Sequence, residues 1–103
     1  MFGSLSGSKI GIWVVHGEGK FVLPKEESAY NIVAKCIYSE YPGNPNGSDY
    51  DTAAVCSDDG RHLAIMPHLE RALFPWQCAN YPYQYIKEDV TPWMEAFVNA
   101  RKW

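Results

Sequence analysis

The 103-residue chain is long enough for one small domain, and its 47% hydrophobic content can support a core. Its formal net charge is −3 and it carries no basic stripe, which argues against nucleic acid as a partner. No apolar run approaches the roughly 18 residues that a membrane span needs, and the amino-terminal residues lack a signal-peptide pattern, so we expect no membrane partner.

The first half of the chain predicts strands separated by turns. Residues 1–8 are rich in glycine and serine and predict a loop or a frayed end. The nearly apolar run at residues 10–15 predicts a strand covered on both faces, as in an α/β sheet. The following segments predict a short strand at residues 20–23, one or two helical turns at residues 24–30, and a strand at residues 31–39.

The second half predicts a long loop, a hairpin and a helix. Residues 41–48 are dense in turn-forming residues and predict a connection or a functional loop. Apolar runs at residues 52–57 and 61–66 are joined through Asp58-Asp59-Gly60, which predicts an antiparallel hairpin with a type I′ turn.

A helical turn is expected at residues 71–74 and irregular chain at residues 78–90. Thr91-Pro92 then predicts a helix start, with Trp93, Phe97 and Ala100 on one apolar face. The fold class we expect is α/β, a mixed sheet with flanking helices.

A histidine and a carboxylate follow directly after the apolar run that ends at Met66. His68 and Glu70 are two residues apart, so an extended backbone would point both side chains to the same side. An imidazole held by a carboxylate is the base and orienter of a catalytic triad. The alternative to a catalytic role is a structural one, in which His68 and Glu70 lie at a strand end and Glu70 pairs with Arg71 or with a helix terminus. The residues alone do not decide between the two roles.

The missing member of such a triad is the nucleophile. The chain has an odd number of cysteines, Cys36, Cys56 and Cys78, which are widely spaced and form no Cys-x-x-Cys motif. This pattern predicts reduced thiols, as in a cytoplasmic protein, and argues against disulfide bonds and a zinc site. None of them lies in a Gly-x-Cys-x-Gly elbow, and the aspartates after Cys56 would raise its pKa. We therefore expect all three to be structural, and no nucleophile in this chain.

A second His-x-Glu pair stands at His16 and Glu18, within a glycine-rich turn. It predicts either a solvated turn or a loop on the rim of an active site, because open α/β sheets bind ligands at such an edge. A third possibility is a metal site made of both His-x-Glu pairs, although nothing in the spacing requires one. We expect no metal.

Five motifs, taken in order, resemble the glutamine amidotransferase domain of the phosphoribosylformylglycinamidine synthase family. They are Gly-Ile-Trp-Val-Val-His-Gly-Glu-Gly (11–19), Tyr-Pro-Gly-Asn-Pro-Asn-Gly-Ser (41–48), Asp-Gly-Arg (59–61), Met-Pro-His-Leu-Glu-Arg (66–71) and the C-terminal Thr-Pro-Trp (91–93) with Asn-Ala-Arg-Lys-Trp (99–103). The resemblance covers nearly the whole chain.

The resemblance implies a class I glutaminase of doubly wound fold with a Cys-His-Glu triad, which supplies ammonia from glutamine to a synthetase domain of the same chain. That synthetase uses ATP and Mg²⁺ in purine biosynthesis. By the same resemblance His68 is the base and Glu70 its orienter. Leu69 departs from the proline that the family usually has, which we interpret as a change in backbone stiffness and not in chemistry.

The resemblance also leads us to expect that residues 1–103 are the C-terminal half of the glutaminase domain, without the half that bears the nucleophile. Met1 would then be an internal or artificial start, and these residues alone would be inactive. Apolar surface, especially at residues 10–15, should be exposed and could pair with a second copy in a dimer. The alternative is a small interaction module whose aromatic surface binds a protein or a sugar, with Trp76, Tyr81, Tyr83 and Tyr85 as its contacts.

Overall fold

The computed structural model describes residues 1–102; Trp103, the last residue of the C-terminal motif, lies outside the described residues. The chain forms two compact units. The first joins Met1–Trp13 to the chain from His68 onward, and the second comprises Val14–Pro67. His68 and Glu70 therefore fall in the first unit, and His16 and Glu18 in the second.

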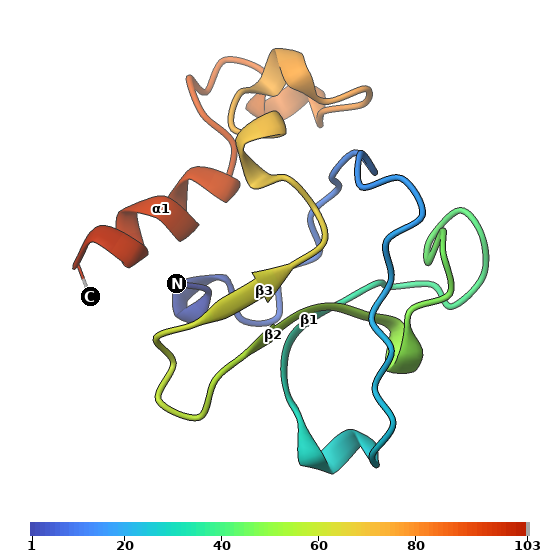
Figure 1. The fold of residues 1–103 in the computed structure, drawn as a ribbon. Helices are drawn as coiled ribbons and strands as arrows, with labels where there is room; N and C mark the ends of the chain where they lie inside the picture. Colours follow the sequence, from blue (N-terminus) through green and yellow to red (C-terminus); the bar gives the residue numbers. More distant parts are fainter. Residues whose placement is uncertain (103) are drawn as a thin grey trace. The chain divides into compact units, whose positions relative to one another are not determined.

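The second unit is built on a three-stranded sheet in the order β1-β2-β3 (Figure 1). The strands are β1 (Asn31–Lys35), β2 (Thr52–Cys56) and β3 (Leu63–Ile65). Val55 lies opposite Ile32 on one side and Ala64 on the other, and both strand pairs are antiparallel. The predicted hairpin is confirmed. The predicted mixed sheet is wrong for the described residues, although an antiparallel sheet with a helix is compatible with the α/β class.

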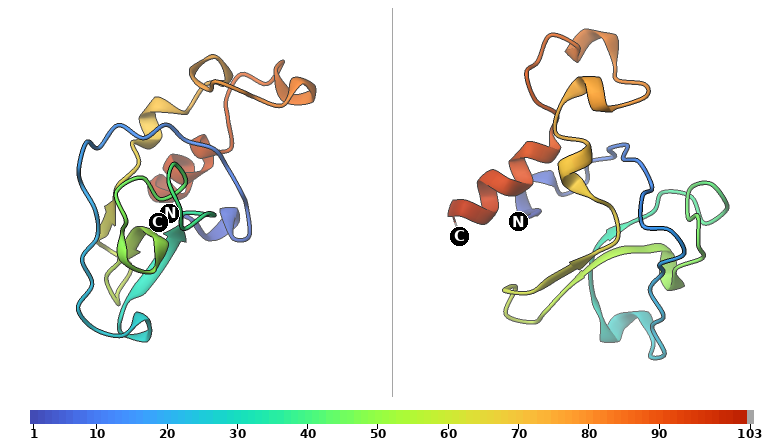
Figure 2. Two further views of the ribbon diagram at one scale, coloured as in Figure 1. Left: turned by 90° about the vertical axis from the view of Figure 1, so that its right-hand side faces the viewer. Right: turned by 45° about the horizontal axis from the view of Figure 1, so that its top comes forward.

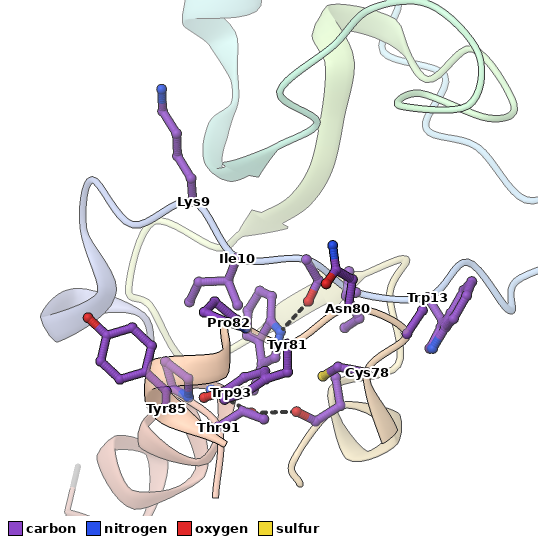
Figure 3. Close-up of a pocket in the computed structure, with 15 residues that line it drawn as sticks. Lys9, Ile10, Trp13, Cys78, Asn80, Tyr81, Pro82, Tyr85, Thr91 and Trp93 are labelled. Atoms are coloured by element: carbon purple, nitrogen blue, oxygen red, sulfur yellow. Dashed lines mark hydrogen bonds between the residues drawn. The ribbon is translucent and has the colours of Figure 1, made fainter. Parts of the chain in front are cut away.

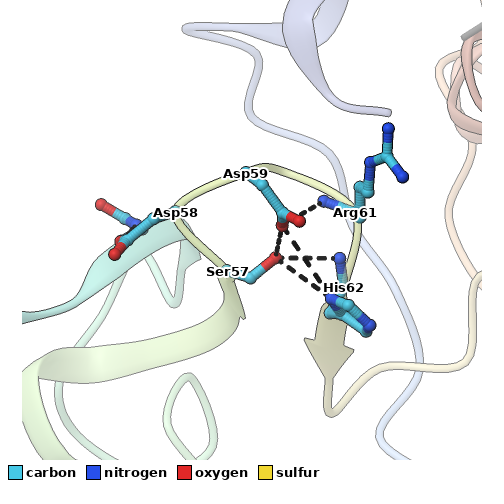
Figure 4. A network of polar contacts seen from close by, with 6 residues as sticks. Ser57, Asp58, Asp59, Arg61 and His62 are labelled. Carbon is cyan, nitrogen blue, oxygen red and sulfur yellow. Dashed lines mark hydrogen bonds and ion pairs between the residues drawn. The ribbon is translucent and has the colours of Figure 1, made fainter.

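The turn between β2 and β3 is wider than predicted. A type I′ turn needs positive φ at both central residues, whereas in this turn only Gly60 has it, at +69°. Ser57 N–H donates to the carbonyl of His62 at 3.0 Å, so four residues connect the pair. Asp59 Oδ1 accepts from the Ser57 hydroxyl at 2.6 Å and from Arg61 N–H at 3.1 Å (Figure 4). The Ser57 hydrogen bond lowers the pKa of Asp59, which keeps this carboxylate charged in the turn.

Residues 20–23 form no strand, contrary to prediction, and Figure 2 draws residues 14–25 without a strand arrow. Their backbone groups are satisfied by the loop before β2 instead of by a sheet ladder. Phe21 N–H donates to Ser48 Oγ at 3.0 Å, and Leu23 N–H donates to Asp49 Oδ2 at 2.8 Å. Polar side chains thus replace a neighbouring strand, because a buried or half-buried N–H must find some acceptor.

Residues 10–15 also form no strand. Trp13 and Val14 are 52% and 47% exposed, so the predicted covering of this run on both faces is wrong, whereas the predicted exposed apolar surface is present. In the first unit, the Trp93 indole N–H donates to the carbonyl of Gly11 at 3.0 Å, and the Trp13 indole N–H donates to the carbonyl of Gln77 at 2.9 Å. Hydrogen bonds from these two indole groups therefore hold residues 11–13, in place of the backbone hydrogen bonds of the predicted strand. The dimer built on this run stays a prediction.

The first unit ends in helix α1 (Trp93–Lys102), which packs against the amino-terminal turn η1 (Gly3–Leu5). The Asn99 side-chain amide donates to the carbonyl of Met1 at 3.1 Å and to Ser4 Oγ at 2.6 Å. Of the two alternatives predicted for residues 1–8, a loop or a frayed end, the frayed end is wrong, because Asn99 of the helix holds Met1 and Ser4.

The predicted start of this helix is confirmed, and its predicted apolar face is wrong. Thr91 Oγ1 accepts from Trp93 N–H at 3.3 Å, as an N-cap does. Ala96 is fully buried, whereas Phe97 is 39% exposed. The side of the helix that carries Asn99 faces η1, so the helix is rotated away from the orientation that apolar periodicity favours.

Single 3₁₀ turns make up the remaining regular structure: η2 (Glu27–Ala29), η3 (Asp49–Asp51), η4 (Leu69–Arg71), η5 (Pro75–Gln77) and η6 (Tyr83–Tyr85). η2 falls within the predicted helical turns at residues 24–30. η4 starts two residues before the turn predicted at residues 71–74.

The core is smaller than the hydrophobic content predicts. The buried apolar residues among residues 1–102 are Ala53 and Ala54 in the second unit and Leu69, Ala72 and Ala96 in the first. Leucine is the largest of these, so little apolar area is removed from water in either unit. No helix within residues 1–102 is long and apolar enough to cross a membrane.

Candidate active site

The histidine and the glutamate of the first His-x-Glu pair lie together in the first unit. His68 Nδ1 is 2.8 Å from Glu70 Oε1. His68 has extended backbone angles (φ −90°, ψ 98°) and precedes η4, which contains Glu70. The sequence predicted that an extended strand would point both side chains to the same side. In the structure the two side chains meet because a 3₁₀ turn begins directly after His68. That turn is closed by a hydrogen bond from Arg71 N–H to the carbonyl of His68 at 3.1 Å.

The pair fixes which imidazole nitrogen carries the proton. An ionised carboxylate can only accept, so Nδ1 of His68 must be the donor. The hydrogen bond from His68 lowers the pKa of Glu70, with smaller contributions from the Glu70 backbone and from Arg71, and so keeps the carboxylate ionised. Neutral His68 therefore has its lone pair on Nε2. Its side chain is 47% exposed, so Nε2 can receive a proton from another group.

Two residues hold this turn, one of which, Leu69, the sequence indicated only as a change in backbone stiffness, and one of which, Gln77, it did not indicate. Leu69, between the pair, is only 4% exposed. The Gln77 side-chain amide donates to the carbonyl of Glu70 at 3.2 Å, while its oxygen accepts from Phe74 N–H at 2.9 Å. Leu69 could have been found as the one apolar side chain between two polar ones; nothing in the sequence marks Gln77.

Four aromatic side chains of the first unit line a cavity of about 500 Å³ (Figure 3). The cavity lies among Trp13, Tyr81, Tyr85 and Trp93, and neither His68 nor Glu70 lines it. Burial, followed by the nearby Glu88 charge, raises the pKa of Tyr81. Two of the four aromatic residues predicted for an interaction surface, Tyr81 and Tyr85, thus line this hollow.

The other two predicted aromatic residues, Trp76 and Tyr83, are 80% and 88% exposed. Trp76 stacks on Phe74 with ring centroids 5.9 Å apart.

The second His-x-Glu pair lies on a tight turn of the second unit. Gly19 N–H donates to the carbonyl of His16 at 3.1 Å, and Gly17 has a φ of +60°. His16 is half-buried and Glu18 is exposed. Asn46, from the loop at residues 41–48, contacts this turn through its amide nitrogen. Nowhere in residues 1–102 do three or more His, Cys, Asp or Glu side chains gather as a metal site requires.

All three cysteines have free thiols. Burial, and then the Asp51 charge, raises the pKa of Cys36, which opposes formation of a thiolate. Cys56 lies in β2, and the Cys78 thiol is 3.9 Å from the carbonyl of Phe74. Within residues 1–102 no hydrogen bond joins a cysteine to a histidine, because the imidazoles of His16, His62 and His68 contact Asn46, Ser57 and Glu70 instead.

Comparison with known proteins gives one family and a consistent set of relatives. The family model for the CobB/CobQ-like glutamine amidotransferase domain matches residues 1–103. The chain is 38% identical to phosphoribosylformylglycinamidine synthase of Homo sapiens, over 100% of the chain and 9% of that protein. It is 39% identical to the probable phosphoribosylformylglycinamidine synthase, chloroplastic/mitochondrial, of Arabidopsis thaliana, over 100% of the chain and 8% of that protein.

A relative from Dictyostelium discoideum, also a phosphoribosylformylglycinamidine synthase, is 37% identical over 94% of the chain and 8% of its own length. The chain thus spans less than a tenth of the length of these three relatives. The resemblance that the five motifs indicated is confirmed.

Proposed function

The chain belongs to the family of CobB/CobQ-like glutamine amidotransferase domains, and on that premise we propose that it takes part in the release of ammonia from glutamine. The observation that carries this proposal is the 2.8 Å contact between His68 Nδ1 and Glu70 Oε1. In the neutral form of the imidazole this contact places the proton on Nδ1 and leaves the Nε2 lone pair free, which is the arrangement that a general base needs.

In the proposed reaction, Nε2 of His68 takes the proton of a cysteine thiol, and the thiolate attacks the side-chain amide carbon of glutamine. The imidazolium then gives its proton to the leaving nitrogen, so ammonia departs and a glutamyl thioester remains. Water, activated by the same nitrogen, hydrolyses the thioester to glutamate and restores the thiol. Glu70 holds the ring and stabilises the imidazolium in both steps.

We assign the thiol to polypeptide outside residues 1–103. This assignment is supported by the raised pKa of Cys36 and by the hydrogen bonds of the described residues, none of which joins a cysteine to a histidine. Residues 1–103 would then be the C-terminal half of a doubly wound class I glutaminase domain and would have no activity alone. His16 and Glu18 are proposed as rim residues of the glutamine site.

For the natural polypeptide that carries these residues, we propose the activity named for its relatives, phosphoribosylformylglycinamidine synthase. It would be a glutamine-dependent ligase of purine biosynthesis whose synthetase portion binds ATP and Mg²⁺ and receives the ammonia. No residue of this chain is assigned to ATP or Mg²⁺. The three free thiols fit a reducing compartment such as the cytoplasm.

A second candidate function, the aromatic interaction module, has one observation in its favour. Trp76 and Tyr83 are 80% and 88% exposed, as contact residues for a protein or a sugar would be. We propose this binding as an addition to the proposed glutaminase role and not as a replacement for it.

Replacing Glu70 by glutamine tests the proposed role of the carboxylate. The carboxamide can offer its NH₂ group to Nδ1 and so favour the unproductive tautomer. Because Glu70 is 59% exposed and water can partly replace it, we expect glutamine-dependent kcat/KM to fall about 10- to 100-fold. Steady-state kinetics of the full natural polypeptide with glutamine, and separately with ammonia, measures this.

The matched control is Glu26→Gln, because Glu26 makes no side-chain cap to η2, and it should leave both activities unchanged. An unchanged glutamine-dependent rate in Glu70→Gln, or an equal loss of the ammonia-dependent rate, would contradict the role of Glu70.

A further inference from the structure

The Gln77 side chain contacts the turn that joins His68 to Glu70. Its amide nitrogen donates to the carbonyl of Glu70 at 3.2 Å, and its amide oxygen accepts from Phe74 N–H at 2.9 Å. Because a backbone N–H can only donate, the atom that faces Phe74 must be the amide oxygen, which leaves the NH₂ group for Glu70. The two contacts together therefore determine the orientation of the amide.

The carbonyl that Gln77 contacts lies at the end of η4. The hydrogen bonds that close this turn are accepted by the carbonyls of His68 and Leu69. The next carbonyl in the series is that of Glu70, and the Gln77 amide supplies its donor. Gln77 thus satisfies one of the acceptors that the end of a helical turn leaves open.

Gln77 is itself fixed by contacts within the first unit. Its N–H donates to the carbonyl of Phe74 at 2.9 Å, and its carbonyl accepts from the Trp13 indole N–H at 2.9 Å. Gln77 is half-buried, whereas the side chains of His68 and Glu70 are 47% and 59% exposed. A well-held amide therefore contacts an exposed pair, and it needs little reorganisation to hold the backbone of that pair.

Holding the Glu70 carbonyl also limits where the Glu70 carboxylate can lie. The carbonyl and the side chain are attached to the same Cα, so a rotation of the backbone at Glu70 moves both. The contact between Glu70 Oε1 and His68 Nδ1 is 2.8 Å long, and a rotation of the Glu70 backbone would lengthen it. Displacements of about 1 Å are enough to slow a reaction that depends on such a contact.

We propose that Gln77 is a positioning residue for the glutaminase reaction, whose side-chain NH₂ group holds the Glu70 backbone and so keeps the Glu70 carboxylate on His68 Nδ1. This inference rests on the proposed function. Gln77 acts through Glu70 and touches neither glutamine nor the thiol. Its effect therefore falls on proton transfer and not on the binding of glutamine.

The first test replaces Gln77 in the full natural polypeptide. Gln77→Met keeps the length of the side chain and removes its hydrogen bonds. We expect glutamine-dependent kcat to fall about 3- to 10-fold, as the loss of a neutral hydrogen bond implies, with KM for glutamine and the ammonia-dependent rate unchanged. Gln77→Glu keeps the acceptor for Phe74 N–H and lacks the donor for Glu70, so its kcat should fall at least as far.

The matched control is Gln84→Met, the same substitution at an exposed glutamine of η6. It should leave kcat, KM and the ammonia-dependent rate unchanged.

The second test is a double-mutant cycle with Glu70→Ala. In that variant Gln77 has no carboxylate to position, so adding Gln77→Met should lower kcat by less than about twofold more. A merely structural role would instead give independent losses. A further fall of about 3- to 10-fold in the double variant would show that Gln77 acts by another route, and it overturns the proposal.

A wild-type kcat in Gln77→Met or Gln77→Glu, a rise in KM in place of the fall in kcat, or an equal loss of the ammonia-dependent rate also overturns it. Failure of the proposed function is distinguishable, because His68→Ala would then keep glutamine-dependent synthesis. If His68→Ala loses that activity and Gln77→Met keeps a wild-type kcat, the role of Gln77 alone is wrong.

Discussion

Glutamine-dependent synthesis by the natural polypeptide will fall about 10²–10⁴-fold when His68 is replaced by alanine, while ammonia-dependent synthesis stays near the wild-type rate. The reason is the position of the lone pair. Glu70 Oε1, 2.8 Å from Nδ1, leaves Nε2 as the one nitrogen of this ring that can accept the proton of a thiol. Alanine removes that acceptor, whereas externally supplied ammonia makes the acceptor unnecessary.

The control for this substitution is His62→Ala. His62 has an 84% exposed side chain and belongs to the hairpin turn, so its loss should leave both activities intact. Equal loss of the two activities in His68→Ala would mean that the substitution damages folding and not proton transfer. Full glutamine-dependent activity would remove His68 from the mechanism.

Replacing Leu69 by alanine should give the largest loss of local stability, about 2–5 kcal/mol. Leu69 is 4% exposed and is the largest buried apolar side chain among the described residues, so alanine leaves a cavity under the turn that joins His68 to Glu70. The Arg71 and Ala72 amides, which close this turn, should then exchange with solvent at least about tenfold faster.

Hydrogen–deuterium exchange of the peptide that covers η4, read by mass spectrometry on the full natural polypeptide, measures this change. Val22→Ala is the control, because Val22 is 68% exposed and its truncation should leave exchange unchanged. Unchanged exchange at Arg71 and Ala72 in Leu69→Ala would show that the buried leucine does not hold the turn.

Local signals in the sequence predicted the features that depend on neighbouring residues. The β2–β3 hairpin, the capped start of α1 and the His68–Glu70 pair all depend on residues within a few positions of one another, and all three are present. Even there the details differ, because the hairpin uses a four-residue connection and the pair meets through a 3₁₀ turn.

Features that depend on distant partners were not predictable in the same way. Residues 20–23 have the composition of a strand, but Ser48 and Asp49 side chains take their backbone donors. The side of α1 that faces η1 is determined by the hydrogen bond between Asn99 and Ser4. The spacing of apolar residues does not predict such a polar contact. Leu69 was interpreted as a change in backbone stiffness, whereas its side chain is buried, and the contact of Asn46 with the His16 turn had no sequence signal.

The central claim is that His68 and Glu70 serve a thiol that residues 1–103 do not contain. Its most direct test is to treat the full natural polypeptide with an electrophilic diazoketone analogue of glutamine and to locate the modified cysteine by peptide mass spectrometry. We predict a single labelled cysteine outside residues 1–103, whose rate of labelling falls in His68→Ala. Labelling of Cys36, Cys56 or Cys78, or a rate that His68→Ala leaves unchanged, would contradict the account.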